Sequence, residues 1–276
     1  MWTGANVLKN ATGYNLTQLI VGSEGTLCIV TKIVLKLIPY PKYDLLMLVP
    51  FASLEKAGAA VSAIFRAGFV PSALELIEIN ALQIVSKMVD STVVPVTETT
   101  EGHLIIEVDG NNMDVLMQEV EAIAELLVEF DAGDILFADD AQQKAELWKL
   151  RRRAAEAVKL DGYTIEEDTV VPRAELPALI KGVKELGIQY GFKVVCYGHA
   201  GDGNLHINIL RPQGITKEDF VKECRKVDQI VFQAVQKQQG SISAEHGVGL
   251  TKKSFLNYTR SAAEIEIMRG IKKVFD

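Results

Sequence analysis

Three of the four histidines in this 276-residue sequence stand beside glycine turns or carboxylates. His199 and His206 flank the turn Ala-Gly-Asp-Gly-Asn-Leu in YGHAGDGNLHIN, and His246 follows Glu245 in SAEHGVG. If the segments on either side of the turn pair as a hairpin, the first two imidazoles meet at its mouth, where neutral imidazoles bind divalent cations. We predict a metal site formed by His199, His206 and Glu245, with open coordination positions as in a catalytic site. Zinc, manganese and iron all accept these ligands, and the alternative is that the histidines only hydrogen-bond within their turns.

His246 has a different predicted role. When Glu245 faces a metal, its neighbour faces another side, and an imidazole is a fitting general base for a hydroxyl proton. A nearby cation assists by lowering the pKa of that hydroxyl. Asp202 is a further candidate ligand, although an aspartate in Gly-Asp-Gly more often bonds its own turn. The pattern therefore predicts metal-assisted removal of a proton from a hydroxyl group.

A second glycine turn separates two apolar segments and consists of Gly22, Ser23, Glu24, Gly25 and Thr26. Glycines let a backbone approach a flat ligand closely and expose N–H groups to an anion. The turn matches neither a Walker loop nor the dinucleotide-binding GxGxxG motif. It is a candidate cofactor contact, and the alternative is an ordinary connection between two strands.

Consecutive arginines occur in the stretch LWKLRRRAAEA. On a helix, Arg151, Arg152 and Arg153 spread over about 200° of the circumference, so they do not all face one way. One of them is a candidate for bidentate binding of a substrate carboxylate. The alternative is a solvated basic face that Glu146 and Glu156 balance.

Composition limits the class of protein. The chain is 48% hydrophobic and 24% charged, which suffices for a substantial core, and its formal net charge of −7 argues against nucleic acid as the main partner. No apolar run reaches the roughly 18 residues of a membrane span, and the first residues lack the features of a signal peptide. Cys28, Cys196 and Cys224 are widely spaced, so we predict core thiols in a reducing, cytoplasmic setting.

Hydrophobic periodicity alternates between strand and helix along the chain. We predict strands at 19–21, 26–39, 45–50, 72–77, 103–108, 134–138, 163–170, 193–197, 205–210 and 240–244. We predict helices at 53–67, 79–87, 113–129, 140–159, 175–186, 216–238 and 262–274, loops at 1–17 and 90–102, and a linker at 39–43. Several connections are short, so the pattern predicts an α+β fold with an antiparallel or mixed sheet, helices packed on one face and two βαβ-type halves.

Four segments together resemble a known family: NATGYNLTQLIVGSEGTLCIVT, LWKLRRRAAEA, YGHAGDGNLHIN and SAEHGVGLTKK. They resemble the FAD-linked oxidases of the vanillyl-alcohol-oxidase type, among them glycolate oxidase FAD subunits, D-lactate dehydrogenases and D-2-hydroxyglutarate dehydrogenases. The resemblance runs over essentially the whole chain. It implies that residues 1–38 are the tail of a FAD-binding domain and that 43–276 form a ferredoxin-like cap that covers the flavin and supplies the substrate site. Because the chain begins inside a glycine-rich loop, we expect it to be a piece of a longer protein whose preceding domain holds most of the FAD.

The resemblance also implies roles for single residues. It assigns the metal to the same three ligands, the base to His246, a substrate contact to Asn208 and the grip on the substrate carboxylate to Arg151. The glycine turn at 22–26 would lie against the cofactor. The implied reaction is transfer of hydride from C2 of a small 2-hydroxy acid to flavin N5, while the metal polarises the hydroxyl.

Two departures from the family pattern bear on the substrate and the cofactor. Members that act on a second carboxylate tend to carry a lysine where this chain has the acidic run at 165–168, which favours glycolate or lactate over 2-hydroxyglutarate. Cys28 replaces a glycine usual after the glycine turn. We expect further oxidase subunits or an electron-transfer partner and a homo-oligomer. The alternatives are a metal-dependent hydrolase and a non-catalytic module that docks another subunit.

Overall fold

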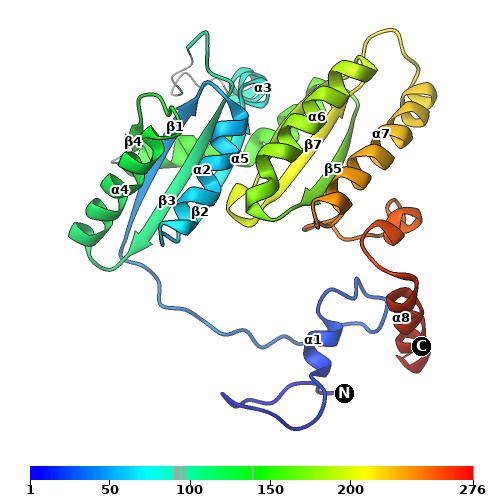
Figure 1. Ribbon diagram of the computed structural model, residues 1–276. Coiled ribbons are helices and arrows are strands. Elements are labelled where there is room, and N and C mark those ends of the chain that lie inside the picture. The colour runs from blue at the N-terminus through cyan, green and yellow to red at the C-terminus, as the bar shows by residue number, and fades with distance from the viewer. Residues whose placement is uncertain (90–93, 95–96, 139, 276) are drawn as a thin grey trace.

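A seven-stranded antiparallel sheet runs through the molecule (Figure 1). The computed structural model describes residues 1–276 except 90–93, 95–96, 139 and 276, so part of the predicted loop at 90–102, residues 90–93 and 95–96, lies outside the described residues. The sheet order is β4-β1-β3-β2-β6-β7-β5, and every neighbouring pair is antiparallel. The strands are β1 (Tyr43–Phe51), β2 (Ala73–Glu78), β3 (Gly102–Gly110), β4 (Leu136–Ala138), β5 (Thr164–Val170), β6 (Lys193–Gly198) and β7 (Asn204–Leu210).

Helices cover both faces of this sheet. On one face lie α2 (Leu54–Arg66), α4 (Met113–Val128), α6 (Leu176–Tyr190) and α7 (Lys217–Lys237), and on the other lie α3 (Ile79–Val89) and α5 (Ala141–Asp161). Alternation along β1 shows why: Met47 and Val49 pack into the core under the first set, whereas Leu46 and Leu48 pack under the second. The α+β class and the antiparallel sheet are confirmed, and α3 and α5 add a second helical layer to the predicted single one.

The sheet consists of two ferredoxin-like halves joined at β2 and β6. In the first half, β1-α2-β2-β3-α4-β4 follows the split βαβ pattern. In the second half, β5-α6-β6-β7-α7 repeats it, but the fourth strand is reduced to one bridge between Ser241 and Val170. The predicted strand at 240–244 is therefore wrong in extent, because only one of its residues pairs with β5.

Two parts of the chain lie apart from the sheet (Figure 1): the residues before β1, which include α1 (Leu16–Ile20), and the helix α8 (Ala262–Phe275). The segment between α7 and α8 stays against the sheet, because Ser241 pairs with β5 and the 3₁₀-helix η3 (Lys253–Tyr258) packs against α7. The predicted strand at 19–21 is wrong, because Asn15 caps a short helix there by accepting the N–H of Gln18. The predicted strand at 26–39 is also wrong: within the described chain no strand pairs with it, and Ile33 and Leu35 remain 72% and 74% exposed. None of the described helices has the length and apolar character needed to cross a membrane.

Candidate active site

The predicted hairpin exists and brings His199 and His206 together. Strands β6 and β7 pair in register around the short 3₁₀-helix η2 (Ala200–Asp202), and the two rings lie 6.1 Å apart between centroids. Gly203 closes the turn with a φ of +76°, and a Cβ there would lie 2.0 Å from the carbonyl oxygen of Val171. The turn therefore requires glycine for its backbone conformation and for space.

Glu245 joins the two histidines from a later loop. Its Oε1 lies 3.2 Å from Nε2 of His199, and its Oε2 lies 3.8 Å from Nε2 of His206. One potential ligand atom from each of the three residues falls within 4.8 Å of the others. Ligands that share a cation at about 2.0–2.2 Å are spaced no more than about 4 Å apart, so a small closure would complete the donor set. The residues therefore fit a divalent cation.

Two further carboxylates lie behind the imidazoles. Nδ1–H of His199 donates to Oε1 of Glu75 at 2.6 Å, and Glu166 Oε1 lies 3.1 Å from His206 Nδ1 without the alignment of a hydrogen bond. The hydrogen bond that His199 donates to Glu75 raises the pKa of His199, and the contact with His206 is the largest cause that lowers the pKa of Glu166 to about 2. A carboxylate on Nδ1 turns Nε2 toward a metal and makes the imidazole a stronger ligand.

A second donor set shares one of these imidazoles. Glu166, His206 and His246 also place one potential ligand atom each within 4.8 Å of the others. The ring centroids of His206 and His246 lie 5.4 Å apart. The structure therefore gathers all three predicted histidines. Of the two donor sets, only the one with Glu245 has the Nε2 atoms of His199 and His206 facing the same carboxylate.

Asp168 holds the loop that carries Glu245 and His246. Its Oδ2 accepts the backbone N–H groups of Ala244, Glu245 and His246 at 3.0, 2.9 and 2.9 Å. Its Oδ1 accepts the side-chain amide of Asn204 at 2.7 Å. Burial alone would raise the pKa of Asp168, but the backbone N–H bonds outweigh it and lower that pKa to about 2. The buried carboxylate is therefore an ionised anchor for the loop.

The side chain of His246 lies beside Asp168 and is partly exposed to solvent. Its side chain is 53% exposed, and Nδ1 lies 4.0 Å from Oδ2 of Asp168. Lys252 fixes the same loop further along, because its buried ammonium donates to the carbonyl oxygens of Ile242 at 2.7 Å and Asp168 at 3.1 Å and pairs with Glu167 at 3.1 Å. The loop is held from beneath, which leaves the His246 ring accessible to a ligand.

Arg151 is the inward-facing arginine of the three. It is 9% exposed on α5, whereas Arg152 and Arg153 are exposed as the solvated alternative predicts. Its Nε donates to Oε2 of Glu75 at 2.7 Å, and its guanidinium carbon lies 5.6 Å from the centre of the Tyr197 ring. Nη2 is buried and has no hydrogen-bond partner in the described part of the chain. That donor is available for the oxygen of a ligand.

Asn208 lies on β7 and is fully buried. Its amide is next to the Tyr197 hydroxyl, but neither amide atom makes a well-aligned hydrogen bond to any described residue. Burial raises the pKa of Tyr197 to about 12, so the phenol stays protonated. Unsatisfied buried polar atoms are rare in proteins and indicate a place where a ligand or water completes the bonding.

Three carboxylates of the cluster escaped the sequence reasoning: Glu75, Glu166 and Asp168. Glu75 stands between Leu74 and Leu76 in the strand sequence ALELIE, and a charged side chain flanked by buried leucines was the signal for it. Glu166 and Asp168 stand in the acidic run on β5, where they alternate onto the face that meets His206. The acidic run is visible in the sequence, but the contacts of these two side chains depend on strand pairing between β5 and β7.

The glycine turn at 22–26 lies next to the loop after His246. Thr26 Oγ1 donates to the carbonyl oxygen of Ser23 at 2.6 Å, and Glu24 accepts the N–H groups of Val248 and Gly249, each at 2.8 Å. Gly22 and Gly25 have φ angles of +81° and +73°, and a Cβ at either position would meet open space. The backbone of this turn is therefore open to a flat ligand and fits the predicted cofactor contact.

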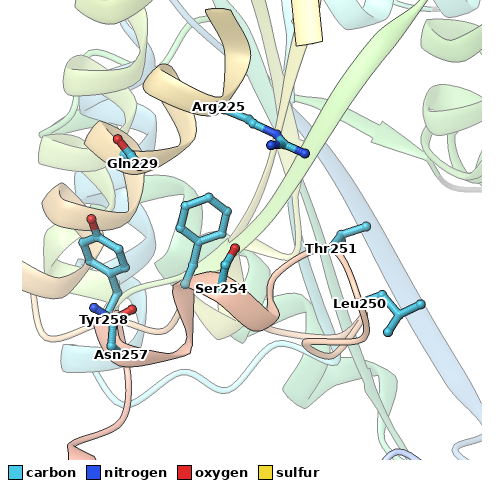
Figure 2. A pocket seen from close by; sticks show the side chains of 8 residues that line it. Arg225, Gln229, Leu250, Thr251, Ser254, Asn257 and Tyr258 are labelled. Atoms are coloured by element: carbon cyan, nitrogen blue, oxygen red, sulfur yellow. The ribbon is translucent and has the colours of Figure 1, made fainter. Parts of the chain in front are cut away.

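A separate hollow lies between α7 and the segment around η3 (Figure 2). Figure 2 shows Gln229 on α7 opposite Asn257 and Tyr258, with Leu250 and Thr251 at the other end. None of the predicted site residues lines it. The histidine cluster and this hollow are therefore different features of the second half of the fold.

The α+β fold and the cluster of histidines and carboxylates agree with one class of protein. The chain belongs to the family described as FAD linked oxidases, C-terminal domain, whose sequence model matches residues 40–276. This match confirms the family that the four sequence segments resemble.

Curated relatives extend the likeness over nearly the whole chain. A D-lactate dehydrogenase from Anaerostipes hadrus is 35% identical over 99% of this chain and 58% of its own length. A D-2-hydroxyglutarate dehydrogenase from Xanthomonas citri pv. viticola is 38% identical over 98% of this chain and 57% of its own. The glycolate oxidase subunit GlcD of Bacillus subtilis is 31% identical over 99% and 57%. The chain thus spans less than two thirds of the relatives it matches.

Solved structures agree with the fold. The structure of p-cresol methylhydroxylase with substrate bound superposes with a TM-score of 0.74 and covers 99% of this chain and 58% of that one. Sequence identity is only 12%, so the likeness concerns the fold alone.

Proposed function

We propose that this chain is the substrate-side part of a FAD-dependent 2-hydroxyacid dehydrogenase or oxidase. In this proposal residues 1–38 end a FAD-binding domain and 43–276 form the cap. The observation that carries it is the loop with Glu245 and His246, which Asp168 holds beside the paired histidines. The relatives named for D-lactate, D-2-hydroxyglutarate and glycolate support the substrate class, because all three compounds are 2-hydroxy acids.

Binding of the substrate rests on two buried donors. The free Nη2 of Arg151 binds the substrate carboxylate, and Glu75 keeps the guanidinium in place through Nε. The amide of Asn208 bonds a second polar atom of the substrate. Glu166, ionised beside His206, repels a second carboxylate, which favours glycolate or D-lactate over a dicarboxylate.

His246 performs the proton transfer in this proposal. Nε2 accepts the proton of the 2-hydroxyl, while Nδ1 lies on the side of Asp168, whose negative charge stabilises the resulting imidazolium. A divalent cation held by His199, His206 and Glu245 would supply the charge that lowers the pKa of that hydroxyl. FAD lying against Gly22, Ser23, Glu24, Gly25 and Thr26 would supply the hydride acceptor.

The relatives also bear on the electron acceptor and on the assembly of the proposed enzyme. One relative is named as a subunit of glycolate oxidase, which supports further oxidase subunits or an electron-transfer partner that reoxidises the flavin. The proposed enzyme is also compatible with a homo-oligomer. The unpaired thiols of Cys28, Cys196 and Cys224 support a cytoplasmic setting.

The activity test uses the longest protein that contains this chain, with FAD, glycolate or D-lactate and a dye as electron acceptor. His246→Ala should lower kcat by at least about a hundredfold, because general base catalysis contributes that much or more. FAD and metal content should stay unchanged. The control is Glu125→Gln, at an exposed position on α4. Unchanged turnover would remove His246 from the mechanism, and dye-independent cleavage of an ester would favour a hydrolase instead.

The metal test uses the 276-residue chain itself. Titration with zinc or manganese should show one tight site, and His199→Ala should weaken binding by at least about tenfold. Equal metal content in the wild type and His199→Ala would contradict the assigned ligands.

A further inference from the structure

We infer that Glu24 is a positioning residue that holds the loop of Glu245 and His246 against the glycine turn at 22–26. Its Oε1 accepts the N–H of Val248 and its Oε2 the N–H of Gly249, each at 2.8 Å. Both carboxylate oxygens thus bond the loop directly after His246, from a turn more than two hundred residues earlier in the chain. Hydrogen bonds from backbone N–H groups to an ionised carboxylate are among the strong ones.

Gly247 gives an independent sign that the loop is built around this carboxylate. Its φ is +77°, and a Cβ would lie between 2.6 and 2.9 Å from the carboxylate atoms of Glu24. Any other residue would strain the backbone and push Glu24 away from the two N–H groups. The loop has a glycine at the position where the carboxylate approaches it most closely.

The loop is consequently held by two carboxylates from distant parts of the chain. Asp168 of β5 binds the N–H groups of residues 244–246, and Glu24 binds those of 248 and 249. His246 lies between the two anchors, so a shift of the glycine turn moves the loop on one side of it. This step rests on the proposed function: if the turn lies against the flavin, Glu24 keeps His246, the proposed base, in a fixed position relative to the cofactor.

Amide hydrogen exchange on the 276-residue chain tests the contact without any cofactor. In the wild type, the amides of Val248 and Gly249 should be protected, and Glu24→Ala should speed their exchange by at least about tenfold. Gly247→Ala should do the same, because it expels the carboxylate. The amides bound to Asp168 should keep their protection, and Glu125→Gln should change nothing. Unprotected wild-type amides, or protection that survives Glu24→Ala, would overturn the inference.

Turnover in the longest protein that contains this chain tests the positioning role. Glu24→Ala should lower kcat by about tenfold and leave KM nearly unchanged, because the substrate carboxylate contacts are untouched. Glu24→Gln, which keeps one acceptor oxygen, should recover part of the loss. Lost protection with an unchanged kcat would refute the positioning role. If the wild type oxidises no 2-hydroxy acid, the proposed function fails, while the exchange result still decides whether Glu24 holds the loop.

Discussion

The carboxylate of Glu75 on β2 lies 2.6 Å from Nδ1 of His199, which follows β6. The two strands pair antiparallel at the junction of the two halves, so the contact exists only because the halves are joined there. The other oxygen of Glu75 accepts a bond from Arg151 at 2.7 Å. One buried carboxylate therefore orients both a predicted metal ligand and the predicted carboxylate-binding arginine.

Glu75→Gln should lower the pKa of His199 toward its ordinary value near 6.5, because the hydrogen bond that His199 donates to the Glu75 carboxylate is the main cause that raises it. A raised pKa contributes stability that is fully present below the unfolded value and is lost as pH rises through the folded value. The wild type should therefore lose stability relative to the variant as pH rises through the neutral range. NMR titration of the His199 ring measures the shift directly, and identical titration curves would contradict the assignment.

Asp168→Asn should destabilise the fold by about 2 kcal/mol at neutral pH, from a pKa about two units below the ordinary 3.8. A lowered pKa contributes stability that is present above the unfolded value and is lost as pH falls through the folded value. The difference in the free energy of unfolding between the wild type and the variant should therefore disappear as the pH falls from about 4 to about 2. Urea unfolding across that range measures it, with Glu125→Gln as the control. A gap that is constant with pH would show that Asp168 acts by packing alone.

Local patterns in the sequence predicted the parts of the site that are local in the chain. The turn between His199 and His206 follows from glycines at positions where the backbone needs them, such as Gly203 with its φ of +76°. The helical spacing around Arg151 indicated only that the three arginines do not all face one way, and the family resemblance selected Arg151, which is the one that the structure buries. Such features depend on neighbouring residues, so a sequence carries their signal.

The remaining parts of the site depend on pairing between distant strands. Glu75 and Asp168 meet their partners only after β2 pairs with β6 and β5 pairs with β7. The same dependence explains the wrong strand at 26–39: its β-branched residues favour extended backbone, but a strand also needs a hydrogen-bonding neighbour. The strand at 240–244 fails for the related reason that only Ser241 reaches β5.

Alkylation should separate the three thiols. Burial raises the pKa of Cys196 and of Cys224 to about 12, and both are fully buried, whereas Cys28 is partly exposed. Because the thiolate is the reactive form, iodoacetamide at about pH 8 should modify Cys28 at least about a hundredfold faster than the other two. Mass spectrometry of tryptic peptides measures the rates, with denaturant as the reference in which all three react. Rapid labelling of Cys196 in the native protein would contradict its placement in the core.

Asp228 on α7 provides a test at alkaline pH. It is 7% exposed, its Oδ1 has no hydrogen-bond partner within the described residues, and burial raises its pKa to about 8, with a further contribution from the nearby Glu167. Between the ordinary 3.8 and about 8 the folded protein holds a proton that the unfolded chain has lost, so stability falls as pH rises through that window.

Asp228→Asn removes this titration and keeps the shape of the side chain. The free energy of unfolding of the variant should therefore decline less steeply with pH than that of the wild type, by up to about 1.4 kcal/mol per pH unit. Urea unfolding from about pH 5 to about pH 8 measures both slopes. The variant should be the more stable protein at the upper end of the range, because the wild type must there either keep the proton or bury a charge. Parallel curves for the two proteins would show that Asp228 is already ionised in the folded state.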